Sequence, residues 1–145
     1  MAIWQFDAHL LPRTRVVEVF ESMPSSISLS EIEREDWFGE LQLSPDIEQQ
    51  IKTMLPEIRS WSKDKRIWGE EDGHRIDILY GDDKVVSILV RISAQDQPIQ
   101  FISKLANLCA EFDLVLVTEA NDVLQPDALL IERAFTNSPA RAFVG

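Results

Sequence analysis

The second half of this sequence contains a regular succession of hydrophobic patterns that restricts the fold more than any other feature. Residues 74–80 and 85–92 alternate apolar and polar side chains on either side of a turn-forming stretch at residues 81–84. Alternation around a short polar turn predicts a β-hairpin. Residues 98–112 then place apolar side chains at helical spacing, and residues 114–118 form a short apolar run. The block therefore predicts two strands, a helix and a third strand.

The start of the chain repeats the pairing of a strand pattern with a helix pattern. Residues 3–11 alternate like a half-buried strand that Pro12 ends, and residues 15–23 carry an apolar stripe after a plausible cap at Thr14. Together with the later block, this gives the order βαββαβ. That order is typical of a ferredoxin-like α+β sandwich, with the first and third strands central and both helices on one face.

Two further segments extend this unit, and residues 1–145 are expected to form a single domain. Residues 27–69 are predicted to be a helical insert after the first helix, with one helix starting at Ser44-Pro45-Asp46. Residues 127–145 are predicted to add a C-terminal helix and tail, after a short strand at residues 123–124. The alternative is another α+β arrangement in which the insert adds strands to the sheet.

The alternation also assigns side chains to the interior and to the surface. Val86 is expected to face inward on its strand and Cys109 to face inward on its helix, whereas His74 is expected to be exposed at a strand start. The predicted core consists of Trp4, Phe6, Ile78, Ile88, Val90, Phe101, Leu105 and Val115.

The charge of the chain restricts its partners. The net charge is −11, and residues 1–50 alone carry 3 basic and 10 acidic residues. This charge repels nucleic acid and anionic membranes and favours a basic protein partner. Cys109 is the sole cysteine, which excludes an intramolecular disulfide. With no apolar stretch of about 20 residues and no recognisable signal peptide, a cytoplasmic location is expected.

One polar surface emerges when the strands are aligned. The outward positions of three strands bring together Asp7, His9, Asp77 and Arg91. The first interpretation is cross-strand pairing of opposite charges. The alternative is a small enzyme or ligand-binding domain that uses these four residues, since carboxylates and an imidazole support acid–base chemistry. No catalytic residue, metal site or cofactor is predicted, because no glycine-rich phosphate loop, HExxH or GxSxG motif is present.

A second surface is predicted in the insert, where acids lie next to aromatic rings. The candidate partner-binding residues are Glu33, Glu35, Asp36, Trp37 and Phe38. In protein interfaces, such rings act as anchors and such charges steer association. This role requires Trp37 or Phe38 to be exposed in the free protein. The alternative is that the rings of the insert, including Trp61 and Trp68, dock the insert onto the sheet.

Several short pieces of the chain resemble a set of small, uncharacterised bacterial proteins. The pieces are Trp4-Gln-Phe6 through Leu11-Pro12, Ser60-Trp61-Ser62, Trp68-Gly69, and Asp72-Gly73-His-Arg75-Ile-Asp77. Some of these proteins resemble immunity partners of secreted bacterial toxins. The resemblance implies a non-enzymatic, acidic protein-binding domain that antagonises a basic toxin, and it carries over no catalytic residue. A homodimer formed through the sheet is a further alternative.

Overall fold

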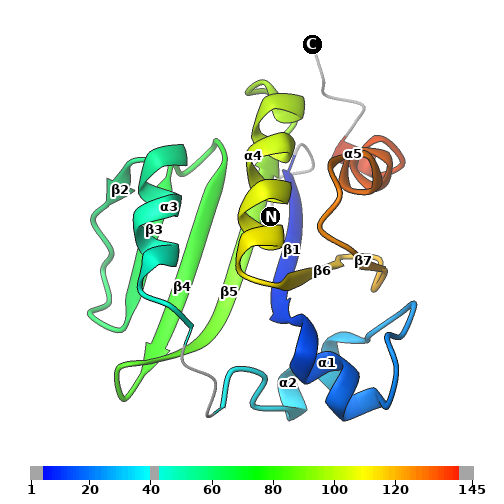
Figure 1. Ribbon diagram of the computed structural model, residues 1–145. Coiled ribbons are helices and arrows are strands. Elements are labelled where there is room, and N and C mark those ends of the chain that lie inside the picture. Colours follow the sequence, from blue (N-terminus) through cyan, green and yellow to red (C-terminus); the bar gives the residue numbers. More distant parts are fainter. Residues whose placement is uncertain (1–4, 40–42, 141–145) are drawn as a thin grey trace.

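The computed structural model describes residues 5–39 and 43–140. Over these residues the chain forms an antiparallel sheet of seven strands, in the order β2-β3-β4-β5-β1-β6-β7, with five helices (Figure 1). The strands are β1 Gln5–Pro12, β2 Glu57–Ile58, β3 Lys65–Gly69, β4 Arg75–Gly81, β5 Lys84–Ser93, β6 Leu114–Thr118 and β7 Val123–Leu124. The helices are α1 Arg13–Phe20, α2 Leu29–Arg34, α3 Asp46–Met54, α4 Pro98–Glu111 and α5 Ala128–Thr136.

The α+β class is confirmed, and the sheet is larger than the four strands of a simple βαββαβ unit. The four strands of the predicted unit lie side by side as β4-β5-β1-β6, with β1 and β5 adjacent in the centre. The insert contributes β2 and β3 in addition to its helices, so the purely helical insert was wrong and the alternative with added strands was right on this point. Their short, partly charged sequences carry too little alternation to predict a strand.

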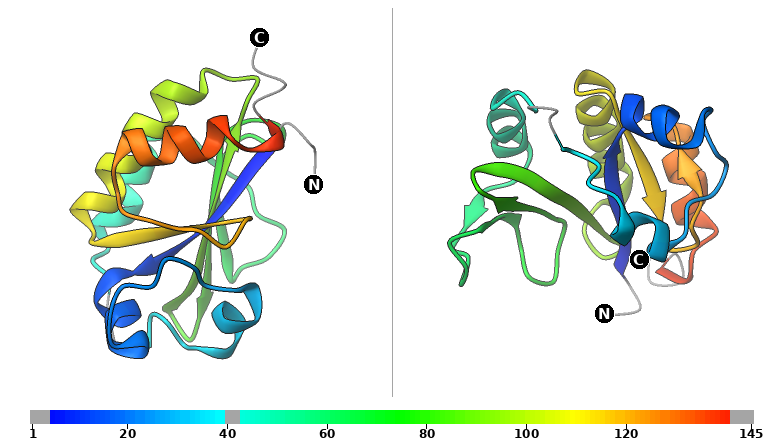
Figure 2. Two further views of the ribbon diagram at one scale, coloured as in Figure 1. Left: turned by 90° about the vertical axis from the view of Figure 1, so that its right-hand side faces the viewer. Right: turned by 90° about the horizontal axis from the view of Figure 1, so that it is seen from below.

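The helices cover the sheet in a different way from the prediction. α4 and α3 lie on one face of the sheet, whereas α1 lies beyond the end of β1 (Figures 1 and 2). α1 buries only Val16, while α3 buries Ile47 and Ile51. α1 starts directly after Pro12 and ends at Phe20, because Glu21 adopts a left-handed conformation with φ of 64°. α3 therefore takes the place beside α4 that was predicted for α1.

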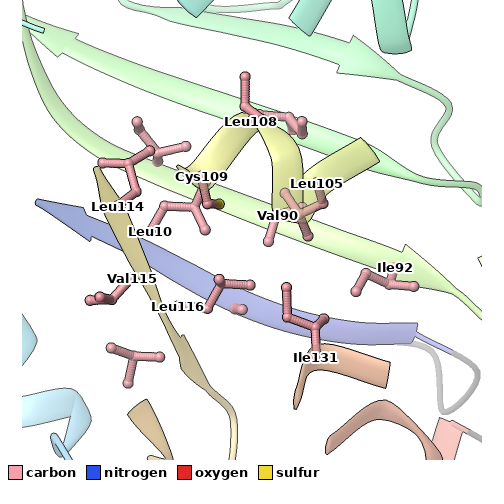
Figure 3. Packing of buried hydrophobic residues seen from close by; sticks show 14 of the residues in the cluster. Leu10, Val90, Ile92, Leu105, Leu108, Cys109, Leu114, Val115, Leu116 and Ile131 are labelled. Carbon is pink, nitrogen blue, oxygen red and sulfur yellow. The ribbon is translucent and has the colours of Figure 1, made fainter. Parts of the chain in front are cut away.

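The core lies between the sheet and α4. Leu105 and Cys109 of α4 point toward Leu10 of β1 and Val90 of β5 (Figure 3). Burial raises the pKa of the Cys109 thiol to about 12, and its predicted place in the core is confirmed. The predicted core residues in the described part of the chain are all buried: Phe6, Ile78, Ile88, Val90, Phe101, Leu105 and Val115. Trp4 lies outside the described residues.

The hairpin between β4 and β5 forms as predicted but contains an irregularity. Asp82 and Asp83 have φ of 52° and 63°, the positive values that a two-residue hairpin turn requires. The register shifts at Leu79/Tyr80, so the pairing of Val85 with Tyr80 leaves Val86 out of the alternation. Val86 is 47% exposed, and its predicted inward orientation was wrong for this reason.

His74 is buried, contrary to the exposure predicted for it. Its ring stacks on Phe101 with 4.2 Å between centroids and an interplanar angle of 8°. Its Nδ1 accepts a hydrogen bond of 3.1 Å from the backbone N–H of Ser93, so Nε2 carries the proton and donates to the carbonyl of Asp96. Burial lowers the pKa of His74, against the opposing effect of Asp96. The histidine thus ties the start of β4 to the end of β5.

Candidate functional site

The charged residues of the open sheet face, on the side opposite α3 and α4, form ion pairs across the strands. Asp7 lies directly opposite Arg91, and Arg91 Nε is 3.2 Å from Asp7 Oδ1. Asp77 receives two bonds from Arg75, of 2.7 and 3.0 Å, and lies 3.2 Å from Lys65 Nζ. The four predicted polar-face residues therefore lie on one face, with three of them already paired. His9 is separated from Asp77 by Leu89, its direct neighbour on β5.

A cavity of about 390 Å³ opens on this face beside His9. Its volume lies within the range of about 300–1,000 Å³ that is usual for ligand sites. It is bounded by β1, β5, β6, the connection after β6, and α2. The polar lining comprises Asp7, His9, Thr118, Glu119 and Asn121, and the apolar lining comprises Ala8, Leu29, Ile32, Leu89 and Val117.

Helix α2 supplies one apolar wall of the cavity, and its start is well defined by the sequence. Ser28 accepts a hydrogen bond of 3.2 Å from the backbone N–H of Glu31, and the carboxylate of Glu31 accepts one of 2.9 Å from the backbone N–H of Ser28. This reciprocal capping box fixes the first turn of the helix. α2 lies on the opposite side of the sheet from α3 and α4 (Figure 2), so that Leu29 and Ile32 meet the open face.

His9 is a polar group of the cavity with unused hydrogen-bonding capacity. Neither of its ring nitrogens makes a hydrogen bond to any residue in the described ranges 5–39 and 43–140. Burial lowers the pKa of His9, while the charges of Asp7 and Glu33 raise it. Because the net shift is downward, the imidazole is neutral at neutral pH and offers one donor and one acceptor to an occupant of the cavity.

Glu119 is a site residue that the sequence did not reveal. Its Oε1 accepts a hydrogen bond of 2.6 Å from the backbone N–H of Asp7. Burial raises the pKa of Glu119, and the charge of Asp7 adds to this shift, whereas the hydrogen bond and the charge of Arg91 oppose it. Glu119 follows β6 directly, and the register that places Ala8 opposite Thr118 brings it beside Asp7.

The predicted partner-binding segment divides into exposed acids and buried rings. Glu33, Glu35 and Asp36 are exposed, whereas Trp37 and Phe38 are only 3% and 1% exposed. The exposure that an anchoring role requires of these rings is therefore absent, and that part of the prediction was wrong.

The reason is the packing of the insert. Trp37 stacks on Phe20 of α1, with 6.1 Å between ring centroids. Its Nε1 donates a hydrogen bond of 2.8 Å to the carbonyl of Ile32. Trp37 therefore docks α2 against α1, whereas the alternative interpretation had placed the insert rings against the sheet. The partner-binding role of the three acids stays a prediction.

Trp61 differs from the other tryptophans in the described part of the chain. Its side chain is 88% exposed, in the connection between β2 and β3, whereas Trp37 and Trp68 are buried. Trp68 lies beneath the guanidinium of Arg66, whose Cζ is 5.0 Å from the ring centroid. Trp61 is thus the insert ring that is accessible to a partner.

Two general features and the comparisons with known proteins complete the description of the site. In residues 5–39 and 43–140 no group of three or more His, Cys, Asp or Glu side chains is arranged to hold a metal ion. No helix in the same ranges is both long enough and apolar enough to cross a membrane. No family model, curated protein or solved structure matches this chain. The molecule is thus an α+β protein with an acidic cavity on the open face of its sheet.

Proposed function

We propose that this protein is a non-enzymatic binding domain for a basic protein, and that a lysine or arginine side chain of the partner enters the cavity beside His9. The observation that carries the proposal is the lining of that cavity. It combines the carboxylates of Asp7 and Glu119 with apolar walls from Leu29, Ile32 and Leu89. A basic side chain has the matching chemistry, since its alkyl stem packs on apolar surface while its charged end binds carboxylates.

The electrostatics around the cavity favour a cation. Asp7 and Glu119 are both acidic, and Glu33 of α2 is close enough to act on the charge of His9. The one nearby cation described above, Arg91, is already bound to Asp7. The fold holds the two carboxylates close together, so they repel each other. An incoming ammonium or guanidinium group relieves this repulsion, and the relief adds to the binding energy.

The exposed acids of the insert extend the same negative surface. Glu33 belongs to α2, the helix that lines the cavity, and Glu35 and Asp36 follow it directly. Exposed charges of this kind raise the rate of association with a basic surface more than they raise affinity. In this proposal, Glu33, Glu35 and Asp36 steer the partner, and the cavity takes over the anchoring role first predicted for Trp37 and Phe38.

Two narrower proposals go with this function. A bacterial, cytoplasmic, immunity-like antagonist of a basic toxin is the form favoured by the resemblance of its sequence motifs. For the fold, we propose a ferredoxin-like unit of β1, β4, β5 and β6, enlarged by β2, β3 and β7. The order β4-β5-β1-β6 and the passage of the chain through α4 from β5 to β6 support it.

A second candidate function is a small enzyme or ligand-binding domain that uses the same face. The observation in its favour is the free imidazole of His9 in a cavity that the carboxylates of Asp7 and Glu119 also line. Asp77 and Arg91 would have only a supporting role, because Asp77 is paired with Lys65 of β3 and Arg91 with Asp7 of β1. Saturable binding of a small neutral or anionic compound at His9, with no affinity for a lysine peptide, would favour this function instead.

The test is a titration of the full chain with a lysine-rich peptide, observed by backbone amide NMR shifts. We expect the largest shifts at the amides that line the cavity, and no comparable shifts with a peptide in which glutamine replaces lysine. Glu119→Gln should weaken binding by about tenfold, the effect of one charge-assisted hydrogen bond of about 1.5 kcal/mol.

The matched control is Glu111→Gln, which removes the same charge from an exposed position at the end of α4 that does not line the cavity. It should change the affinity less than twofold. Equal losses for Glu111→Gln and Glu119→Gln would mean that only net charge attracts the peptide, and the proposed site would be wrong.

A further inference from the structure

The connection between β2 and β3 presents an aromatic ring to solvent in a defined loop. Trp61 is 88% exposed, the largest exposure among the large hydrophobic side chains described as exposed. Two serines shape the loop around it: Ser60 Oγ accepts a hydrogen bond of 3.1 Å from the N–H of Ser62, and Ser62 Oγ accepts one of 3.2 Å from the N–H of Asp64. These hydrogen bonds hold the turn that carries the ring. The loop therefore loses little conformational entropy when the ring binds a partner.

The surroundings of Trp61 are basic, in contrast with the rest of the molecule. Residues 59–66 contain four basic residues and one acidic residue, in a chain with a net charge of −11. Lys65 and Arg66 are engaged by acids of the sheet and α3. Arg59 and Lys63 are exposed and make no ion pair with any residue that the structure describes. The loop therefore offers one ring and two available cations.

The surface that matches this loop is present on the same protein. The cavity beside His9 joins apolar walls to the carboxylates of Asp7 and Glu119, and exposed acids lie next to it on and after α2. An indole ring fits the apolar walls, and flanking cations fit the acidic rim.

The two surfaces lie on different strands of one molecule. The loop joins β2 and β3, whereas the cavity lies over β5, β1 and β6, with β4 between them (Figure 1). Two strand spacings, roughly 10 Å, separate β3 from β5, and His9 on β1 lies one spacing further away. We propose that the Trp61 loop of one copy of this chain docks into the cavity beside His9 of a second copy. This inference rests on the proposed function, since it names the occupant of that same cavity when no other basic protein is present.

Sedimentation equilibrium of the full chain, over a micromolar to millimolar range, tests the contact. We expect the mean mass to rise with concentration for the wild type. Trp61→Ala should weaken association by about tenfold or more, as expected for a ring anchor. Its matched control is Val86→Ala, which removes another exposed apolar side chain and should leave association unchanged. Leu29→Trp, which enlarges an exposed wall residue of the cavity, should weaken association as Trp61→Ala does.

A mixture of two variants gives the sharpest result. Trp61→Ala retains the cavity, and Leu29→Trp retains the loop, so each alone should stay monomeric while the mixture forms a one-to-one dimer. A wild type that stays monomeric throughout, or a Trp61→Ala variant that associates like the wild type, overturns the inference. If the lysine-rich peptide still binds at the cavity of that monomer, the proposed function stands and only the second copy is excluded.

Discussion

Replacing Gly69 with alanine tests the closest backbone contact of the sheet. Gly69 ends β3 with φ of 116°, and a Cβ there would lie 2.0 Å from the carbonyl oxygen of His74. Ordinary contact begins at 3.4 Å, so the two backbones would have to separate by about 1.4 Å. That movement breaks the hydrogen bond of 3.0 Å from the N–H of Glu70 to the same carbonyl. Backbone strain of about 1–3 kcal/mol and a lost hydrogen bond of about 1 kcal/mol together predict a loss of about 2–4 kcal/mol.

Urea unfolding measures this loss, with Gly73→Ala as the matched control. A Cβ at Gly73 would lie 3.2 Å from Cβ and Oε2 of Glu70, so the neighbour would have to give by only a few tenths of an ångström, compared with 1.4 Å at Gly69. We expect Gly73→Ala to cost less than about 1 kcal/mol, as usual where no special backbone conformation is needed. A loss below about 1 kcal/mol for Gly69→Ala, or equal losses for the two variants, would refute the claim that only glycine fits at position 69.

Three other predictions concern the core. Phe101→Ala should reduce the free energy of unfolding by about 3–5 kcal/mol, because the ring is buried and stacked on His74; a loss under about 1 kcal/mol would contradict the observed packing. Burial holds the pKa of His74 in the folded protein below its ordinary value of 6.5. As the pH falls through 6.5, the unfolded chain therefore binds more protons than the folded chain, and the free energy of unfolding should decrease. His74→Gln should flatten this part of the curve measured by urea unfolding at pH 7.5 and 5.5, and an unchanged slope would assign the effect to other groups. Cys109 should react with a thiol reagent only as fast as the protein unfolds, since burial raises its pKa to about 12; rapid labelling of the native protein would mean that α4 opens readily.

The sequence predicted best those elements that combine strong periodicity with clear end signals. α4 and β6 were predicted within a residue or so, because their helical and apolar runs are continuous and Pro98 marks the start of α4. α5 is the helix expected within residues 127–145, and Asp127 caps it by accepting hydrogen bonds from two backbone N–H groups of the helix. The strands β2 and β3 were missed, because their partly charged sequences show neither an apolar run nor a clear alternation.

The candidate site could be predicted in part, for a related reason. Alternation on β1 was sufficient to place Asp7 and His9 on the open face. Glu119 required the register of β6 against β1, which depends on tertiary pairing. The burial of Trp37 also depends on tertiary structure, since its partner Phe20 lies on a different helix. Composition alone therefore does not distinguish a ring that binds a partner from a ring that fills the interior.

The central position of β1 has a consequence for the synthesis of the chain. β1 leaves the ribosome before β5 and β6, yet these two strands are its neighbours, with Phe6 opposite Ile92 and Ala8 opposite Thr118. Pairs so distant in sequence close slowly, on a scale of about milliseconds to seconds. A nascent chain that ends before β6 lacks one neighbour of its central strand, so protease resistance should appear only after residue 118 has emerged. Until then the apolar face of β1 is available to chaperones.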